Sequence, residues 1–215
     1  MKGGYNIYII IVKNEKKKLS LKLISLVLLG ISLIIIPKNT QAYVTFTNDW
    51  EWNYNGAAYF YNVSLSSTYL TAAKSAAANW YHTGYHTNAL YPMTQTNTQT
   101  NSPIDLYSSS SLPNGYFGGT KSFKKGGTLI LRESNGPVDD WLYCKILINE
   151  TFTNSYFGSD NASKKKALLL HEMGHVFGLG HTSNTATIMY PHLDGCTVNS
   201  VTKDDSAGVA NKLHF

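Results

Sequence analysis

The 215-residue sequence has 43% apolar or aromatic residues, which suits one globular domain with a sizeable core and argues against two full domains. Its formal net charge of +5 comes from residues 1–42, which hold seven of the 18 Lys and Arg residues and one of the 13 Asp and Glu residues. The rest of the chain has 11 basic and 12 acidic residues, a net charge of −1, so no basic face for nucleic acid is expected.

Residues 1–42 have the order of a secretory signal peptide. Five lysines between residues 13 and 22 precede an apolar run from Leu23 to Ile36, and Pro37 and a small-residue ending at Ala42 follow. The alternative is a membrane anchor, but the run is shorter than the ~20 apolar residues that span a bilayer. We therefore expect cleavage after Ala42, secretion of residues 43–215 as one extracellular domain, and no stable membrane association afterwards.

The first half of this domain predicts a strand, a helix and a loop region. Residues 45–63 are rich in Trp, Tyr and Phe, which favours a first strand packed on a sheet. Residues 69–80 are rich in alanine and follow Ser66 and Ser67, which predicts a capped scaffold helix. Its expected buried face consists of Leu70, Ala73, Ala77 and Trp80. Residues 83–102 are polar and indicate loops and edge strands.

The second half predicts four strands and a second helix. The expected strands cover residues 103–107, 115–120, 128–131 and 141–149. A helix then begins near residues 160–163 and runs to Phe177, where Gly178 ends it. One helix, several strands and a further helix indicate an α+β domain.

Cys144 and Cys196 are the only cysteines of the sequence. In an oxidising compartment such a pair predicts a disulfide, and the alternative is two buried thiols that act as small apolar side chains. Neither cysteine lies in a CxxC or Cys-His pattern, so a cysteine ligand or nucleophile is poorly supported.

The segment from His171 to His181 contains the pattern HExxHxxGxxH. Residues four apart project from one helix face, so His171 and His175 can bind one Zn²⁺ ion at about 2.0–2.1 Å. Gly178 permits a left-handed turn that reverses the chain, which lets His181 supply a third nitrogen. Three protein ligands leave the fourth position open, as in catalytic zinc sites.

Glu172 follows the first ligand by one residue and therefore lies beside the ion instead of on it. Zinc lowers the pKa of a bound water towards ~7, and the carboxylate can take its proton and pass it to a departing amine. The pattern predicts hydrolysis of peptide bonds, with Glu172 as the general base.

These residues resemble the metzincins, whose zinc motif is followed by a turn that contains methionine. Met189 occupies that place, eight residues after His181. Thr182 directly after the third histidine, and the Asp204-Asp205 pair near the end of the chain, make the sequence most similar to the matrixins, the group that resembles matrix metalloproteinases.

The resemblance implies a twisted, mostly parallel five-strand sheet, two long helices and a small C-terminal part with the methionine turn and a final helix. It implies that Met189 forms an apolar floor under one catalytic zinc, and that Tyr190 and Pro191 border the pocket for the side chain after the cut bond. A protein or peptide substrate would pair with the edge strand. Residues 115–120 and 128–131 are both candidates for that edge.

The sequence also departs from the resemblance. It has no cysteine-containing inhibitory propeptide after Ala42, so the enzyme is expected to be active once exported, and it has no evident loop for a second zinc. Asp139 and Asp140 could contact Ca²⁺, but two carboxylates in a turn are usually just solvated. The remaining histidines, which are read as ordinary surface residues, are His82, His86, His192 and His214.

The alternative function is a secreted binding module that keeps zinc for stability. Its motivation is a run of aromatic residues near the start of the domain, although packing explains such residues more often than binding. The residues are Trp50, Trp52, Tyr54, Tyr59, Phe60 and Tyr61. The enzyme remains the favoured interpretation, and it is expected to act as a monomer.

Overall fold

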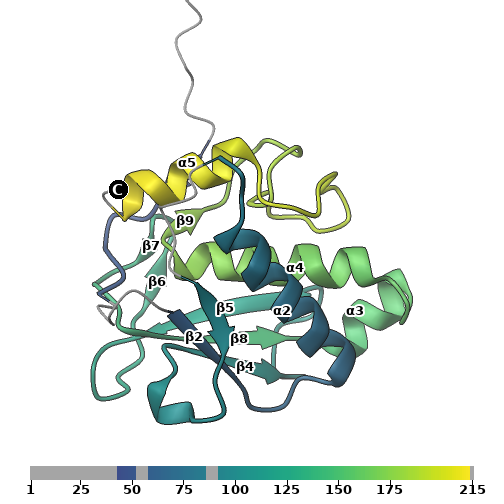
Figure 1. The fold of residues 1–215 in the computed structure, drawn as a ribbon, viewed down its shortest axis with the longest axis horizontal. Coiled ribbons are helices and arrows are strands. Elements are labelled where there is room, and N and C mark those ends of the chain that lie inside the picture. Colours follow the sequence, from purple (N-terminus) through teal and green to yellow (C-terminus); the bar gives the residue numbers. More distant parts are fainter. Residues whose placement is uncertain (1–42, 52–57, 86–91, 214–215) are drawn as a thin grey trace, which may run out of the picture. The chain divides into compact units, whose positions relative to one another are not determined.

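The five-stranded sheet at the centre of the molecule has the strand order β3-β2-β4-β8-β5 (Figure 1). The structure is a computed structural model that describes residues 43–51, 58–85 and 92–213. The strands are β2 (Ala58–Asn62), β3 (Met93–Gln95), β4 (Ile104–Ser108), β5 (Gly118–Phe123) and β8 (Tyr143–Ile148). The pairs among β3, β2, β4 and β8 are parallel, and β5 pairs antiparallel with β8.

Two 15-residue helices, α2 (Ser67–Tyr81) and α4 (Ala162–Val176), pack on each other against the sheet. Alanines 72, 73, 76 and 77 of α2 are buried, and their small side chains allow a close approach. The indole N–H of Trp80 donates to the carbonyl of Leu170 on α4 at 3.1 Å, so the polar atom of this fully buried ring is satisfied. This packing holds α4 in place along the sheet.

Several smaller elements complete the fold. They are β1 (Val44–Thr45), which pairs antiparallel with β9 (Leu179–Gly180), the hairpin of β6 (Arg132–Glu133) and β7 (Gly136–Pro137), the 3-10 turn η1 (Gln99–Asn101), α3 (Glu150–Phe157) and α5 (Lys203–Lys212). Among the described residues, no helix is both long and apolar enough to span a membrane.

The expected α+β architecture, with a mostly parallel five-strand sheet and two long helices, is confirmed. The predicted helix over 69–80 corresponds to α2, although Ser66 at its N-cap makes no capping bond through its side chain. The strands predicted at 103–107 and 141–149 correspond to β4 and β8, and the predicted motif helix corresponds to α4 with Asn161 as its cap.

Four details of the predicted elements were wrong. The single strand expected over 45–63 is two strands, β1 and β2, in different sheets. The strand expected at 115–120 begins at Gly118 and continues to Phe123. Residues 128–131 form only an isolated bridge from Leu129 to Phe123, with Ile130 buried and Leu129 and Leu131 exposed. The short helix α3 was not predicted.

Candidate active site

The motif histidines come together because α4 ends at Val176 and the chain reverses. Gly178 has φ 88°, in the left-handed region, and its carbonyl accepts the N–H of Phe46 at 2.7 Å. A Cβ at Gly178 would also lie 2.8 Å from Lys212 on α5. The chain then runs back as β9 against β1 and places His181 beside the helix.

The three imidazoles have the spacing of ligands around one ion. Nε2 of His181 lies 3.1 Å from Nε2 of His171 and 3.2 Å from Nε2 of His175. Two nitrogens that are each 2.0–2.1 Å from a tetrahedral Zn²⁺ lie about 3.3–3.4 Å apart. Within the described part of the chain, these three side chains are the group of histidine, cysteine or carboxylate residues able to hold a metal.

Hydrogen bonds select the tautomer that a metal requires. Nδ1 of His171 lies 2.9 Å from the carbonyl of Ile188, and Nδ1 of His175 lies 2.8 Å from the carbonyl of Leu179. Because a carbonyl only accepts, each Nδ1 carries the proton and each Nε2 keeps its lone pair. Burial lowers the pKa of His171 to about 4 and that of His175 well below its usual value, so both rings are neutral. The residues present therefore fit zinc.

Glu172 lies beside the triad in a buried position. The hydroxyl of Thr120 on β5 donates to its Oε2 at 2.8 Å. A Cβ on Gly118 would lie 2.9 Å from its Oε1, so only glycine leaves room for the carboxylate. Burial raises the pKa of Glu172 to about 7, against the lowering effects of Thr120 and Arg132. Thr120 and the space left by Gly118 hold this buried carboxylate beside the three imidazoles.

Met189 packs against α4, the helix that carries His171 and His175, and its role as a floor under a zinc ion stays a prediction. A Cβ on Gly174 of α4 would lie 2.4 Å from the sulfur atom of Met189, so the two residues are in close contact. The methionine turn is held from α5, where Oδ2 of Asp205 accepts the N–H of Ile188 at 3.1 Å. Thr202 and Asp205 also form a capping box at the start of α5. The predicted final helix is therefore attached to the methionine turn.

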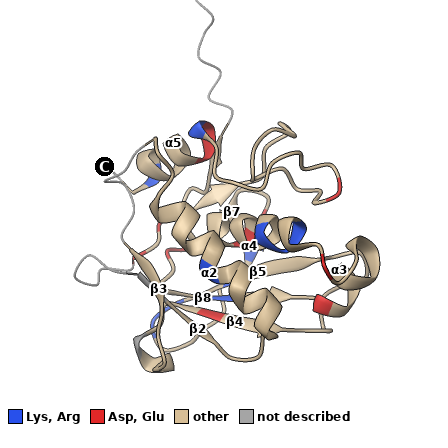
Figure 2. Cartoon of the chain, turned by 45° about the vertical axis from the view of Figure 1, so that its right-hand side comes forward, with Lys and Arg blue, Asp and Glu red and all other residues tan. Residues whose placement is uncertain are grey.

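An open cleft of about 970 Å³ runs past the three histidines and Glu172. Tyr190 and Pro191 both line it, together with Ala167, Leu168 and Leu193, and their role at the side chain after the cut bond stays a prediction. The N-terminal turns of α4 are rich in lysine (Figure 2), and Nζ of Lys164 donates to the carbonyls of Leu193 and Cys196 at 2.6 and 3.1 Å. These bonds fasten the wall of the cleft to α4.

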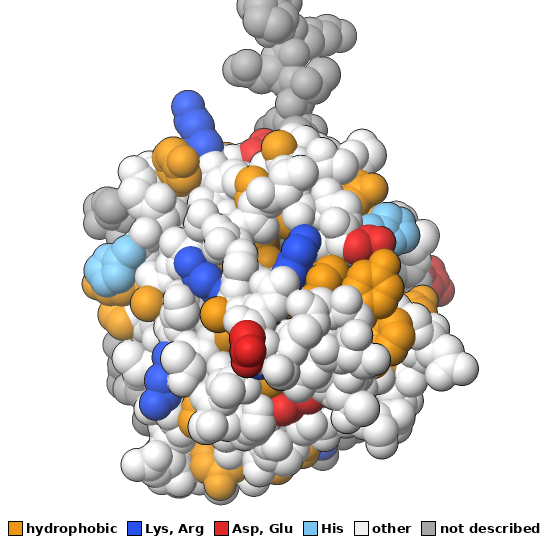
Figure 3. All heavy atoms as spheres, turned by 90° about the vertical axis from the view of Figure 1, so that its right-hand side faces the viewer, with side chains coloured by type: hydrophobic (Ala, Val, Ile, Leu, Met, Phe, Trp, Pro, Cys, Tyr) orange, Lys and Arg blue, Asp and Glu red, His pale blue; other side chains and the backbone are white. Residues whose placement is uncertain are grey.

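The cleft also borders an aromatic cluster around α3 that the sequence did not predict. Phe117 stacks on Phe152 with ring centroids 4.9 Å apart, and exposed Tyr156 meets Phe117 edge-on at 5.3 Å. Figure 3 looks onto the α3 side of the molecule, where hydrophobic side chains gather beside a histidine and an acidic residue. The cleft therefore has an apolar border on this side.

The predicted disulfide was wrong. Cys144 and Cys196 are both buried and free. Cys144 lies in β8, with its sulfur 3.9 Å from the hydroxyl of Ser122, whereas the sulfur of Cys196 lies 3.3 Å from the carbonyl of Val198 in the C-terminal segment. The two thiols belong to different parts of the fold and act as small buried side chains, the alternative that the sequence left open.

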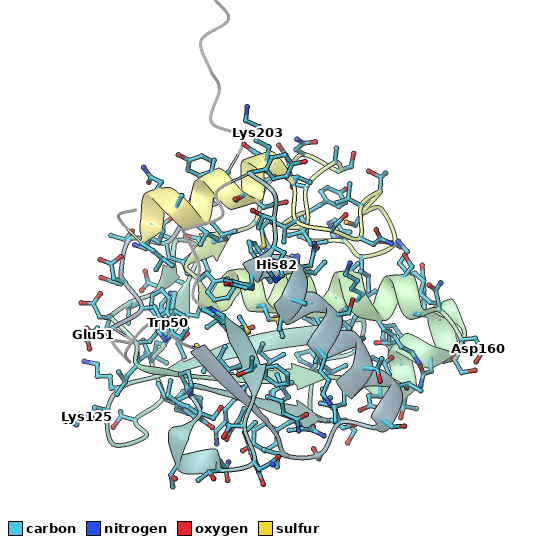
Figure 4. The ribbon with its side chains drawn as sticks, in the orientation of Figure 1. Trp50, Glu51, His82, Lys125, Asp160 and Lys203 are labelled. Atoms are coloured by element: carbon cyan, nitrogen blue, oxygen red, sulfur yellow. The ribbon has the colours of Figure 1, made fainter. Side chains whose placement is uncertain are left out.

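Of the other candidate residues, His192 was wrongly read as an ordinary surface residue, because it lines the cleft with its ring 5.6 Å from that of Tyr190. The remaining described candidates do not join the site. His82 follows the end of α2 (Figure 4), where its ring packs on Tyr81. Asp139 pairs with Lys124, and Asp140 accepts the N–H of Asp49 at 2.7 Å, so both carboxylates have protein partners. His86 and His214, like Trp52 and Tyr54, lie outside the described residues.

Three residues of the site were missed in the sequence: Gly118, Thr120 and Arg132. They lie 39 to 53 positions before His171, where the zinc motif begins, and no local pattern joins them to it. Arg132 did carry a signal, because it is the only arginine of the whole sequence.

Comparison with known proteins gives three similarities. The family model described as Matrixin matches residues 33–214. Matrilysin of Rattus norvegicus is 41% identical over 54 residues, which cover 24% of this chain and only 20% of that protein. Metalloproteinase-II of Bacteroides fragilis superposes with a TM-score of 0.44 and 12% identity over 81% of this chain and 58% of that chain.

Proposed function

The chain belongs to the matrixin family, and on that premise we propose that it is a secreted zinc metalloendopeptidase that hydrolyses peptide bonds of proteins. The observation that supports this most strongly is the spacing of the three imidazole Nε2 atoms, with a buried carboxylate beside them in an open cleft. A zinc site that served stability alone would have four protein ligands, and here three histidines converge from the described residues.

The residues of the site have separate roles in hydrolysis. His171, His175 and His181 would hold the zinc ion through Nε2, with two of the rings fixed by backbone carbonyls. Bound zinc activates water and polarises the carbonyl of the substrate. Glu172 takes the proton of the attacking water and later delivers it to the departing amine. Thr120 and Gly118 keep its carboxylate in the position for both transfers.

The edge strand β5 supports the binding of an extended peptide. The carbonyls of Phe117 and Phe123 accept N–H groups of Asn149 and Leu142, so the odd-numbered residues of β5 face β8. The even-numbered residues Gly118 and Thr120 therefore turn their backbone groups away from the sheet, where β5 lines the cleft. A substrate strand can pair with Gly118 and with the N–H of Thr120, whose carbonyl lies 3.5 Å from Nη1 of Arg132. The side chain after the cut bond would enter the pocket bordered by Tyr190 and Pro191.

The alternative of a binding module has weaker support. Phe60 is buried in the core, and the indole N–H of Trp50 donates to the carbonyl of Leu142 at 3.3 Å. Trp50 and Phe60 of the aromatic run therefore take part in packing, and Tyr61 is half-buried. Export remains part of our proposal, because residues 1–42 have the pattern of a signal peptide. Sequencing the N-terminus of protein collected from the medium should give Tyr43.

The proposal is tested by incubating the purified protein with casein, with and without a chelator. Cleavage should stop when the chelator removes the metal and should return when zinc is added back. Tight binding of casein without cleavage, in protein shown to contain zinc, would instead support the binding module.

A further inference from the structure

Arg132 is the only arginine among 18 basic residues, and it lies on β6 in the wall of the cleft. The other 17 basic residues are lysines. A guanidinium group differs from an ammonium group in its planar, forked set of donors, which matches a carboxylate in two parallel hydrogen bonds. Arg132 is therefore a candidate to bind a carboxylate in the cleft.

The guanidinium is held between three groups of the site. Its carbon atom lies 4.8 Å from the centre of the Phe46 ring, and Nη1 lies 3.5 Å from the carbonyl of Thr120 on β5. Nη2 lies 3.3 Å from Nδ1 of His175. That nitrogen donates its own proton to Leu179, so it has no lone pair for Arg132. The donors on Nη2 therefore remain available to a ligand in the cleft.

The hairpin that carries Arg132 is firmly anchored. A Cβ on Gly136 would lie 2.3 Å from the ring of Phe46, so β7 presses directly on that ring. Nδ2 of Asn48 donates to the carbonyl of Pro137 at 2.8 Å, and the N–H of Val138 donates to the carbonyl of Leu131 at 3.0 Å. The arginine is therefore presented by a fixed element, which suits a residue that determines specificity.

Arg132 has no carboxylate partner among the described residues, where the ion pairs are Lys124–Asp139 and Lys212–Asp49. The charge of Glu172 acts on Arg132, but the two form no ion pair, and the Glu172 carboxylate is hydrogen-bonded by Thr120. A fixed positive charge in a cleft attracts an anion, and an extended peptide brings carboxylates as Asp and Glu side chains.

We infer that Arg132 selects substrates with an acidic side chain on the amino-terminal side of the cut bond, an inference that rests on the proposed peptidase function. Arg132 lies beside His175. Tyr190 and Pro191 lie near the other helix ligand, His171, whose Nδ1 contacts Ile188. Since those two residues border the pocket for the side chain after the cut, Arg132 faces the residues before it. The terminal carboxylate of a peptide would lie on the wrong side to reach it.

The test uses fluorogenic peptides that differ only by Glu or Gln at each position before the cut. At one of these positions, Glu should raise kcat/KM about tenfold or more, mainly through KM. Arg132→Gln should remove this preference, Arg132→Glu should shift it towards Lys, and Arg132→Lys should keep part of it because the charge remains. The control is Lys125→Glu, a charge reversal at a labelled residue outside the cleft lining (Figure 4).

A second readout does not depend on turnover. Zinc-loaded Glu172→Ala protein should bind the Glu peptide about tenfold more tightly than the Gln peptide in calorimetry, and Arg132→Gln in that background should abolish the difference. If the parent protein cleaves peptides with equal rates for Glu and Gln at every position, or if Arg132→Gln keeps the preference, the inference is wrong while the peptidase function stands. Absence of cleavage of any peptide would instead contradict the proposed function.

Discussion

The hydroxyl of Thr120 donates a hydrogen bond to the carboxylate of Glu172 across 2.8 Å, and so joins the edge strand of the sheet to the base of the active site. Thr120 lies within 3.0 Å of the backbone carbonyl of Glu172 as well. The strand proposed to bind the substrate therefore also sets the position of the carboxylate proposed to move the proton.

Replacement of Thr120 by Val should lower kcat while KM changes little. Valine has a similar shape but no donor, so the buried carboxylate loses its partner and its fixed orientation. We expect a loss of roughly 10- to 100-fold in kcat, as for other partners that orient catalytic groups. Thr120→Ser keeps the hydroxyl and should recover most of the activity in steady-state kinetics. Equal losses in Val and Ser variants would show that the methyl group, not the hydrogen bond, matters.

Replacement of Gly118 by Ala should displace the carboxylate of Glu172. The added Cβ would lie 2.9 Å from Oε1 and 3.0 Å from Leu168, so the base must move. A displacement of about 1 Å at a reacting group can cost on the order of 100-fold in rate. Gly119→Ala is the matched control, because its Cβ would meet Leu112 at 3.4 Å, an ordinary contact. The prediction fails if the two variants have the same kcat/KM.

Replacement of Gly174 by Ala should destabilise the whole site. The new methyl group would lie 2.4 Å from the sulfur of Met189 in a fully packed region, and overpacking of this kind costs about 1–3 kcal/mol of unfolding free energy. Met189→Ala in the same protein removes the clash and should restore part of the loss. Urea unfolding of the single and double variants measures both effects, and a Gly174→Ala midpoint equal to that of the parent would contradict the contact.

Both cysteines should be thiols in the native protein, as the structure has them. Burial raises the pKa of the Cys144 thiol to about 12, so it should not react with a thiol reagent at pH 8 until the protein unfolds. After unfolding without reductant, titration should find two thiols per chain. A finding of none would restore the disulfide that the sequence suggested.

The convergence of the three histidines and Glu172 could be predicted because their pattern is local. They lie within eleven residues on one helix and its C-terminal turn, where the periodicity of the helix and the freedom of Gly178 determine the geometry. Thr120 and Arg132 meet them only through the tertiary fold. The separation of these residues along the sequence does not indicate which strand lies beside α4.

The errors in the predicted elements have physical causes of the same kind. The strand expected over residues 45–63 was divided because an aromatic run does not reveal which of two sheets each part joins. The helix α3 has eight residues, including Thr, Phe and Tyr, which have no strong helix preference, and its packing comes from contact with Phe117. The Leu-rich segment 128–131 resembled a strand although its leucines face solvent.

The most direct test measures zinc content and casein cleavage on the same samples of the parent, Glu172→Ala and His175→Ala proteins. The Glu172→Ala protein should keep one zinc per chain and lose at least about 100-fold of the rate, because the ligands remain and the base is gone. The His175→Ala protein should lose both zinc and activity. Cleavage by zinc-loaded Glu172→Ala at the rate of the parent would contradict the role of Glu172 as the base.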